Sequence, residues 1–150
     1  MAANSRFAIA VHILTMMAWA GDEPLKSEQV ACSVNTNPVV IRRILCALQR
    51  ARLVVSQTGA AGGSRLTRKP GQITLLDIYR AVDAGDLFSL HPQPPNEDCP
   101  VGMNIEPVLE GVLAEVGHSI ERVLAKITIE KVLQAIEPRS TSARRGRAGA

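Results

Sequence analysis

The residues from Leu53 to Thr67 constrain the fold most, because they place two strand-like segments around a glycine-rich turn in a chain of helical patterns. The segments LVVSQ and SRLT are rich in β-branched and other strand-forming residues, and Gly59, Gly62 and Gly63 separate them. This order predicts a β-hairpin, because glycine adopts the positive φ angles of tight turns. An ordinary turn explains the glycines but not the cations at the base of the hairpin, which are Arg65, Arg68 and Lys69.

Two short helices joined by a polar turn are predicted directly before the hairpin. Ser27 is the expected N-cap of the first, EQVACSV, and Asn37 caps the second, which begins at Pro38 and reads PVVIRRILCALQRA. The second helix is basic, and its N-terminus can point at a phosphate or a base edge in the major groove. A helix-turn-helix followed by a hairpin is a winged helix, so we predict a mainly α fold with a small β-hairpin wing. The apolar face of the second helix is formed by Ile41, Ile44, Leu45 and Leu48.

Further helices flank this unit. An apolar helix over residues 5–20 precedes it, and the segment LLDIYRAVD follows it with Thr74 as cap. A long helix is expected from Asn104, with a shorter one restarting after Thr128. The chain therefore divides into a winged helix-turn-helix DNA-binding domain (1–83), a sensor loop (84–103), a dimerisation helix with a short C-terminal helix (104–136), and a disordered basic tail (137–150).

The long helix carries an apolar stripe whose members lie three or four residues apart, close to the spacing of a coiled-coil seam. We interpret the stripe as a contact with a second copy of the chain, because the small N-terminal domain has little surface to cover it. Packing within the chain is the alternative. The stripe consists of Ile105, Leu109, Val112, Val116, Ile120, Val123 and Ile127.

Charge is distributed unevenly along the chain. Residues 1–74 hold nine Lys or Arg against three Asp or Glu, whereas residues 75–136 hold four against ten. The excess of positive charge in residues 1–74 indicates that this part of the chain binds a polyanion, and the alternative is that these charges are only solvated surface groups. No run of about 18 apolar residues predicts a membrane span, and the three widely spaced cysteines favour a reducing cytoplasm. No catalytic arrangement, phosphate loop or metal-binding spacing occurs, so we expect neither an enzyme nor a metal site.

Four stretches together resemble the Rrf-two family of bacterial winged-helix regulators: SRFAIAVHIL, NPVVIRRILCALQRARLV, GAAGGSRL and ITLLDIYRAVD. The resemblance continues through CPVG and the long helix. It implies a homodimeric transcription factor, usually a repressor, bound to a palindromic operator in double-stranded DNA. By position, it implies that Lys26 and Ser27 contact phosphates, that Thr36, Asn37, Val39, Arg42 and Arg43 face the major groove, and that Thr58, Gly62, Gly63 and Arg65 belong to the wing.

The sensor loop departs from the cluster-binding members of that family, which place three cysteines there. This loop has only Cys99, and thiolates are the usual cluster ligands, so no cofactor is expected, although rare mixed ligation stays open. The chain is instead similar to a branch with a lone CPVG cysteine. Because Cys99 precedes a helix N-terminus, the helix dipole favours its thiolate, while Glu97 and Asp98 oppose it.

Two interpretations of Cys99 follow. It is either a redox sensor, forming a disulfide most readily with Cys32 of the partner subunit, or a residue that packs at the dimer junction of a regulator whose effector is a small molecule or which has none. Cys46 is interpreted as a small filler residue. A winged-helix module that docks a partner protein and an iron–sulfur-dependent regulator are the alternative functions.

Overall fold

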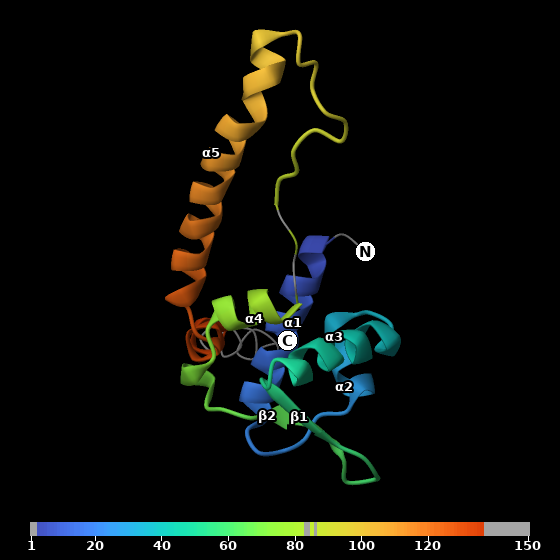
Figure 1. Ribbon diagram of the computed structural model, residues 1–150. Coiled ribbons are helices and arrows are strands. Elements are labelled where there is room, and N and C mark those ends of the chain that lie inside the picture. The colour runs from blue at the N-terminus through green and yellow to red at the C-terminus, as the bar shows by residue number, and fades with distance from the viewer. Residues whose placement is uncertain (1–2, 83–84, 86, 137–150) are drawn as a thin grey trace, which may run out of the picture.

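The computed structural model describes residues 3–82, 85 and 87–136. Helices α1 to α4 and a two-stranded hairpin form one end of the molecule, and α5 extends away from them (Figure 1). Residues 129–136 form a further helix that lies back against this end. The elements are α1 (Ala3–Ala20), α2 (Ser27–Val34), α3 (Pro38–Arg50), β1 (Val54–Gln57), β2 (Gly63–Leu66), the 3-10 helix η1 (Pro70–Gln72), α4 (Leu75–Val82) and α5 (Pro100–Ala125).

The hairpin confirms the predicted wing. β1 and β2 are antiparallel, with Val54 opposite Leu66 and Gln57 opposite Gly63. Leu25, just before α2, pairs with β2 as a single-residue bridge, because it exchanges two backbone hydrogen bonds with Ser64 at 2.9 and 2.8 Å. The wing is therefore attached to the segment that leads into the helix-turn-helix, and the mainly helical winged fold is as predicted.

The core lies where α1 meets α2, α3 and α4. The apolar face predicted for α3 is buried throughout, and Ile41, Ile44 and Leu48 are among the most buried side chains. Ile13 and Leu14 of α1 pack in the same cluster. Because the core takes these aliphatic positions, the arginines of α3 remain on the outer surface.

The caps of α2, α3 and α4 confirm two predictions and correct one. The Asn37 side chain accepts the Val39 N–H at 2.8 Å, as predicted for the start of α3. Thr74 accepts the Asp77 N–H at 3.1 Å, which confirms the cap of α4. The prediction for Ser27 was wrong, because Ser27 is the first residue of α2 and Lys26 is its N-cap. Lys26 is extended, since it continues from the residue that pairs with Ser64, so the helix cannot begin earlier.

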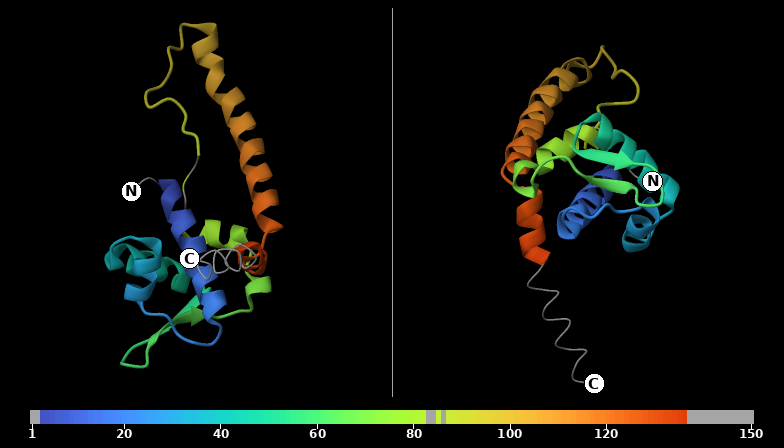
Figure 2. Two further views of the ribbon diagram at one scale, coloured as in Figure 1. Left: turned by 180° about the vertical axis from the view of Figure 1, so that it is seen from behind. Right: turned by 90° about the horizontal axis from the view of Figure 1, so that it is seen from below.

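The loop before the long helix is shorter than predicted, because α5 begins at Pro100 and not at Asn104. Proline is favoured at the first position of a helix, where no N–H is needed, so the segment we assigned to the loop starts the helix. The Asn104 side chain then donates to the Pro100 carbonyl one turn earlier, at 2.7 Å. The start of α5 lies far from the hairpin, as the view from behind in Figure 2 also shows.

The chain after α5 returns to the core. The Leu75 N–H donates to Ile127 at 2.8 Å, the Ile129 N–H donates to Ile73 at 3.0 Å, and the Ile129 side chain is fully buried. Thr128 accepts the Lys131 N–H at 3.2 Å, which confirms the predicted cap of the last helix. The tail that we expected to be disordered, residues 137–150, lies outside the described residues. Across the described residues, every helix is too short or too polar to cross a membrane.

Candidate nucleic-acid interface

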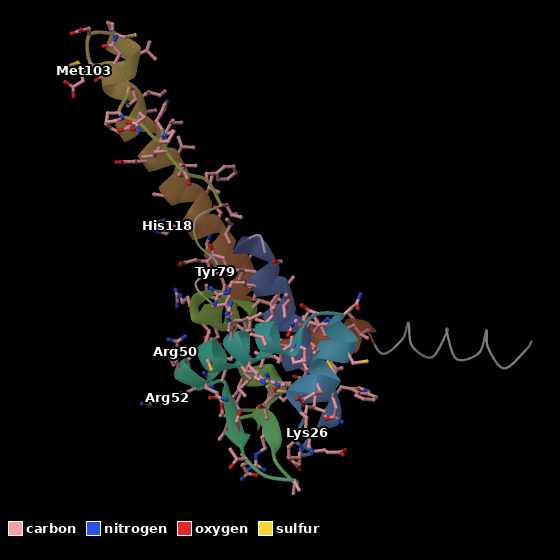
Figure 3. All side chains as sticks on the ribbon, turned by 90° about the vertical axis from the view of Figure 1, so that its right-hand side faces the viewer. Lys26, Arg50, Arg52, Tyr79, Met103 and His118 are labelled. Carbon is pink, nitrogen blue, oxygen red and sulfur yellow. The ribbon has the colours of Figure 1, made fainter. Side chains whose placement is uncertain are left out.

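The helix-turn-helix and the wing lie together at the end of the molecule opposite the start of α5. Figure 3 shows Lys26, Arg50 and Arg52 at this end and Met103 at the other. Arg50 and Arg52 lie together beside α3 and β1, and Lys26 lies on the other side of the hairpin. The cations of the basic half are thus spread across one end of the fold.

The exposed side of α3 carries the residues assigned to the major groove. Arg42, Arg43 and Asn37 are exposed, and Val39 is 44% exposed despite being apolar. Thr36 is half-buried, and its N–H donates to the Ala31 carbonyl at the end of α2, at 3.0 Å. The structure therefore places the assigned residues on one accessible edge, with α3 held by its buried face.

Arg42 is not free on this edge. Its Nη2 atom lies 3.2 Å from Oε1 of Glu28 on α2, so an ion pair connects the two helices. The Glu28 backbone N–H holds the pKa of this carboxyl below its usual value, and Arg42 and Lys26 lower that pKa further. Sequence reasoning missed Glu28, although a signal was present, since it is the only acidic residue between Glu23 and Asp77.

The wing glycines have structural reasons that the sequence did not reveal. A Cβ on Gly62 would lie 2.2 Å from the Gln57 carbonyl oxygen, and one on Gly63, at φ +152°, would lie 2.8 Å from the Leu25 carbonyl oxygen. The Gly62 N–H donates to the Gly59 carbonyl at 3.0 Å, so this backbone group is used within the turn. Glycine is required at position 62 by close backbone packing inside the hairpin, and at position 63 by the close approach of the segment that leads into α2.

Exposed polar side chains remain available on the wing. Thr58, at the tip, and Arg65, on β2, are both exposed. A hydroxyl pair joins the strands behind them, since the Ser56 and Ser64 oxygens lie 2.6 Å apart, and Gln49 of α3 donates to Ser56. This network, which sequence reasoning also missed, connects the wing to α3.

A groove of about 420 Å³ separates the helix-turn-helix from the wing. Lys26, Glu28 and Arg42 line one part of it, and Gln57 and Gly59 line the wing side. Cys46 also lines the groove and is exposed, so our interpretation of Cys46 as a filler residue was wrong. The helical periodicity explains this, because Cys46 is on α3 opposite the buried Ile44 and Leu48.

The far end of α5 carries Cys99 as its N-cap. Cys99 is exposed, and the backbone N–H groups of Gly102 and Val101 lower the pKa of its thiol. This is the effect expected of a helix N-terminus. Nearby, His91 Nδ1 lies 3.9 Å from Glu106 Oε1, which connects the loop to α5.

α5 has no buried side chain along its described length. Within the predicted stripe, Val112 and Val123 are 52% and 58% exposed, and Ile127 lies beyond the end of the helix. Val101 and Val108, outside that stripe, are also more than half exposed. The apolar surface of α5 is therefore broader than the predicted seam.

Together, the α2–α3 pair, the wing beside it and the arginines on the outer edge define a winged helix-turn-helix regulator that binds DNA. Residues 3–135 match the family Rrf2, described as "Iron-dependent Transcriptional regulator". The chain belongs to the Rrf2 family.

Individual relatives agree with this assignment. YwnA of Bacillus subtilis strain 168, which has the provisional name of an HTH-type transcriptional regulator, is 41% identical over 131 residues, covering 87% of this chain and 96% of YwnA. A solved structure described provisionally as a DNA binding protein is 36% identical, with a TM-score of 0.69, and covers 85% of this chain and 98% of its own. IscR of T. potens is 26% identical with a TM-score of 0.68, covering 89% and 87%.

The family is described as iron-dependent, so we compared the positions of the His, Cys, Asp and Glu side chains with what an iron site needs. Within residues 3–82, 85 and 87–136, no three His, Cys, Asp or Glu residues are grouped so that they could hold a metal ion. Cys32 and Cys46 lie on α2 and α3, away from Cys99 at the start of α5. This set of donors does not fit a cluster held by thiolates of one chain.

Proposed function

We propose that two copies of this chain associate through α5 and bind a palindromic operator in duplex DNA as a repressor. In this arrangement the N-terminal part of α3 enters the major groove and the wing reaches the minor groove. A two-fold symmetric dimer presents two such units to the DNA, so the operator should have two half-sites related by the same two-fold symmetry. DNA binding also implies that the chain acts where the chromosome is, which we take to be the cytoplasm.

The observation that carries this proposal is the exposed basic edge of α3 beside the wing. Arg42, Arg43 and Arg65 are exposed and lie outside the core, so α3 and β2 do not need them for packing. Arginines in such positions are suited to phosphate oxygens and to the O6 and N7 acceptors of guanine. Lys26 adds charge next to the groove between them.

Dimerisation is supported by the surface of α5. A hollow of about 500 Å³ on this helix is lined mainly by apolar side chains, with Val112, Val116, Ile120 and Val123 among them. Valines more than half exposed on a projecting helix are unusual for a protein that acts alone. A second α5 would cover them, and would fix the spacing of the two α3 helices.

The proposal is tested by binding of the purified chain to a pool of duplexes with a randomised centre, measured over a range of salt concentrations. We expect the affinity to fall steeply with salt, because phosphate contacts release counterions. Replacing both Arg43 and Arg65 by Glu should abolish binding. Lys126→Glu, which reverses one positive charge at the end of α5, is the control and should retain it.

A slope near zero in the plot of log affinity against log salt would refute the DNA-binding role. A protein-interaction module would give that slope, and its partner binding would not depend on duplex DNA. Sedimentation of the free chain tests the dimer separately.

We also propose that oxidation of Cys99 controls operator binding. Its exposure and its lowered thiol pKa support this role, because the thiolate is the reactive form. A disulfide with Cys32 needs a second chain, since α2 lies far from the start of α5 within one chain (Figure 1). Its formation removes two electrons and two protons from the thiols, which an oxidant such as hypochlorite accepts.

Hypochlorite titration of operator binding tests this control. Wild type should release DNA, whereas Cys99→Ser should not, with Cys46→Ser as the matched control. Equal release by all three proteins would exclude Cys99. In that case a small-molecule effector becomes the better explanation, and the groove of about 600 Å³ between residues 87–90 and α5, which Tyr79 and His118 also line (Figure 3), is where we would seek it.

A further inference from the structure

Glu28 is the one acidic residue placed among the cations of the proposed DNA-binding face. Between Glu23 and Asp77 the chain has eight Lys or Arg and no other acidic residue. Glu28 stands on the first turn of α2, and its carboxylate meets Arg42 of α3 at 3.2 Å. Both side chains line the groove between the helix-turn-helix and the wing.

A role in stability alone does not account for this pairing. A carboxylate in the first turn of a helix interacts favourably with the helix dipole, but that interaction does not need Arg42. The Glu28 and Arg42 side chains are 66% and 55% exposed, and exposed ion pairs contribute little to stability. The main physical consequence of the pair is therefore on the freedom and charge of Arg42.

We propose that Glu28 is a positioning residue that makes Arg42 selective for one base pair. A guanidinium has five N–H donors in a planar fork, and Glu28 holds one side of it while leaving other donors for a base. An unpaired arginine would reach any nearby phosphate, and phosphate contacts carry no sequence information. The Glu28 carboxylate also repels phosphates, so DNA without the matching base gains less from this face.

This inference rests on the proposed function, since it assumes that the face binds duplex DNA. The experiment selects duplexes from a pool with a randomised centre, once with wild type and once with Glu28→Gln, which keeps the shape of the side chain and removes its charge. Affinities for the selected duplex and for the unselected pool are then measured over a range of salt concentrations. A thermal melt checks that the variant is folded.

We expect Glu28→Gln to bind the unselected pool more tightly and with a steeper salt dependence, because Arg42 becomes available to phosphates. The ratio of affinities for selected and unselected DNA should fall by about tenfold, the contribution of one bidentate base contact. The duplexes selected by the variant should lose their preference at one base pair in each half-site.

Two controls isolate the pair. Glu23→Gln removes the same charge from the neighbouring loop, where no side-chain ion pair involves it within the described residues, and should leave the ratio unchanged. In an Arg42→Ala background, Glu28→Gln should cause no further loss of selectivity. If Glu28→Gln and Glu23→Gln change both affinities by the same factor, the inference is wrong. A wild type that binds no duplex refutes the proposed function instead.

Discussion

Ile129 connects the long helix to the DNA-binding end, so replacing it with Ala tests the architecture most directly. The side chain is fully buried in the same cluster as Ile13, Ile41 and Ile78, although it lies in the last part of the described chain. Truncating a buried Ile to Ala costs about 2–5 kcal/mol, because the transfer free energy is lost and a cavity remains. For a chain of this size, about 3 kcal/mol corresponds to a fall in Tm of roughly 6–12 °C.

Urea unfolding at a fixed protein concentration measures this loss, and repeating it at several concentrations separates it from any change in association. Ile136→Ala is the matched control, since it is the same truncation on the same helix at a side chain that is 47% exposed. We expect the control to cost less than about 1 kcal/mol. A loss below that level for Ile129→Ala as well would show that the segment is not docked in the core, and would refute our account of how α5 is attached.

Three further predictions concern the wing, α5 and the thiol. Gly62→Ala should weaken DNA binding far more than it lowers Tm, because its Cβ collides with the Gln57 carbonyl in the hairpin and not with the core; equal affinity in a fluorescence anisotropy titration would contradict this. Val123→Glu should give a monomer by sedimentation, since a charge would be buried between the helices; a persistent dimer would place the contact elsewhere. Alkylation of Cys99 by iodoacetamide should begin at lower pH than that of free cysteine, because the backbone N–H groups of Gly102 and Val101 lower the pKa of its thiol and the thiolate is the reactive form; the reverse order, read by mass spectrometry, would exclude an activated Cys99.

The winged fold could be predicted from the sequence because its signals are local. The apolar face of α3, the Asn37 cap and the strand–glycine–strand pattern each depend on residues within a few positions of one another. For the same reason the errors are small displacements at helix starts. Ser27 and Pro100 were misassigned because a cap depends on the backbone that enters it, and sequence patterns do not report that backbone.

Features that depend on distant residues could not be predicted in this way. The Glu28–Arg42 pair spans 14 positions, and the clash that requires glycine at position 63 is with Leu25, on another segment. The return of Ile129 to the core joins residues more than fifty positions apart. Each of these contacts forms only when the helices pack together, so composition and periodicity cannot predict them.

The attachment of α5 determines how control at Cys99 can reach the DNA. A helix of 26 residues is about 39 Å long, so a change at its start does not touch α3 or the wing of the same chain. At its other end, Ile127 and Ile129 are hydrogen-bonded to the segment that follows the wing, and Glu121 lies 3.4 Å from Arg80 of α4. The helix is thus fixed where it meets the DNA-binding end and free where the thiol lies. We therefore propose that an effect of Cys99 reaches the DNA through a second chain, either by changing how two α5 helices pair or through a disulfide to the partner's Cys32 on α2.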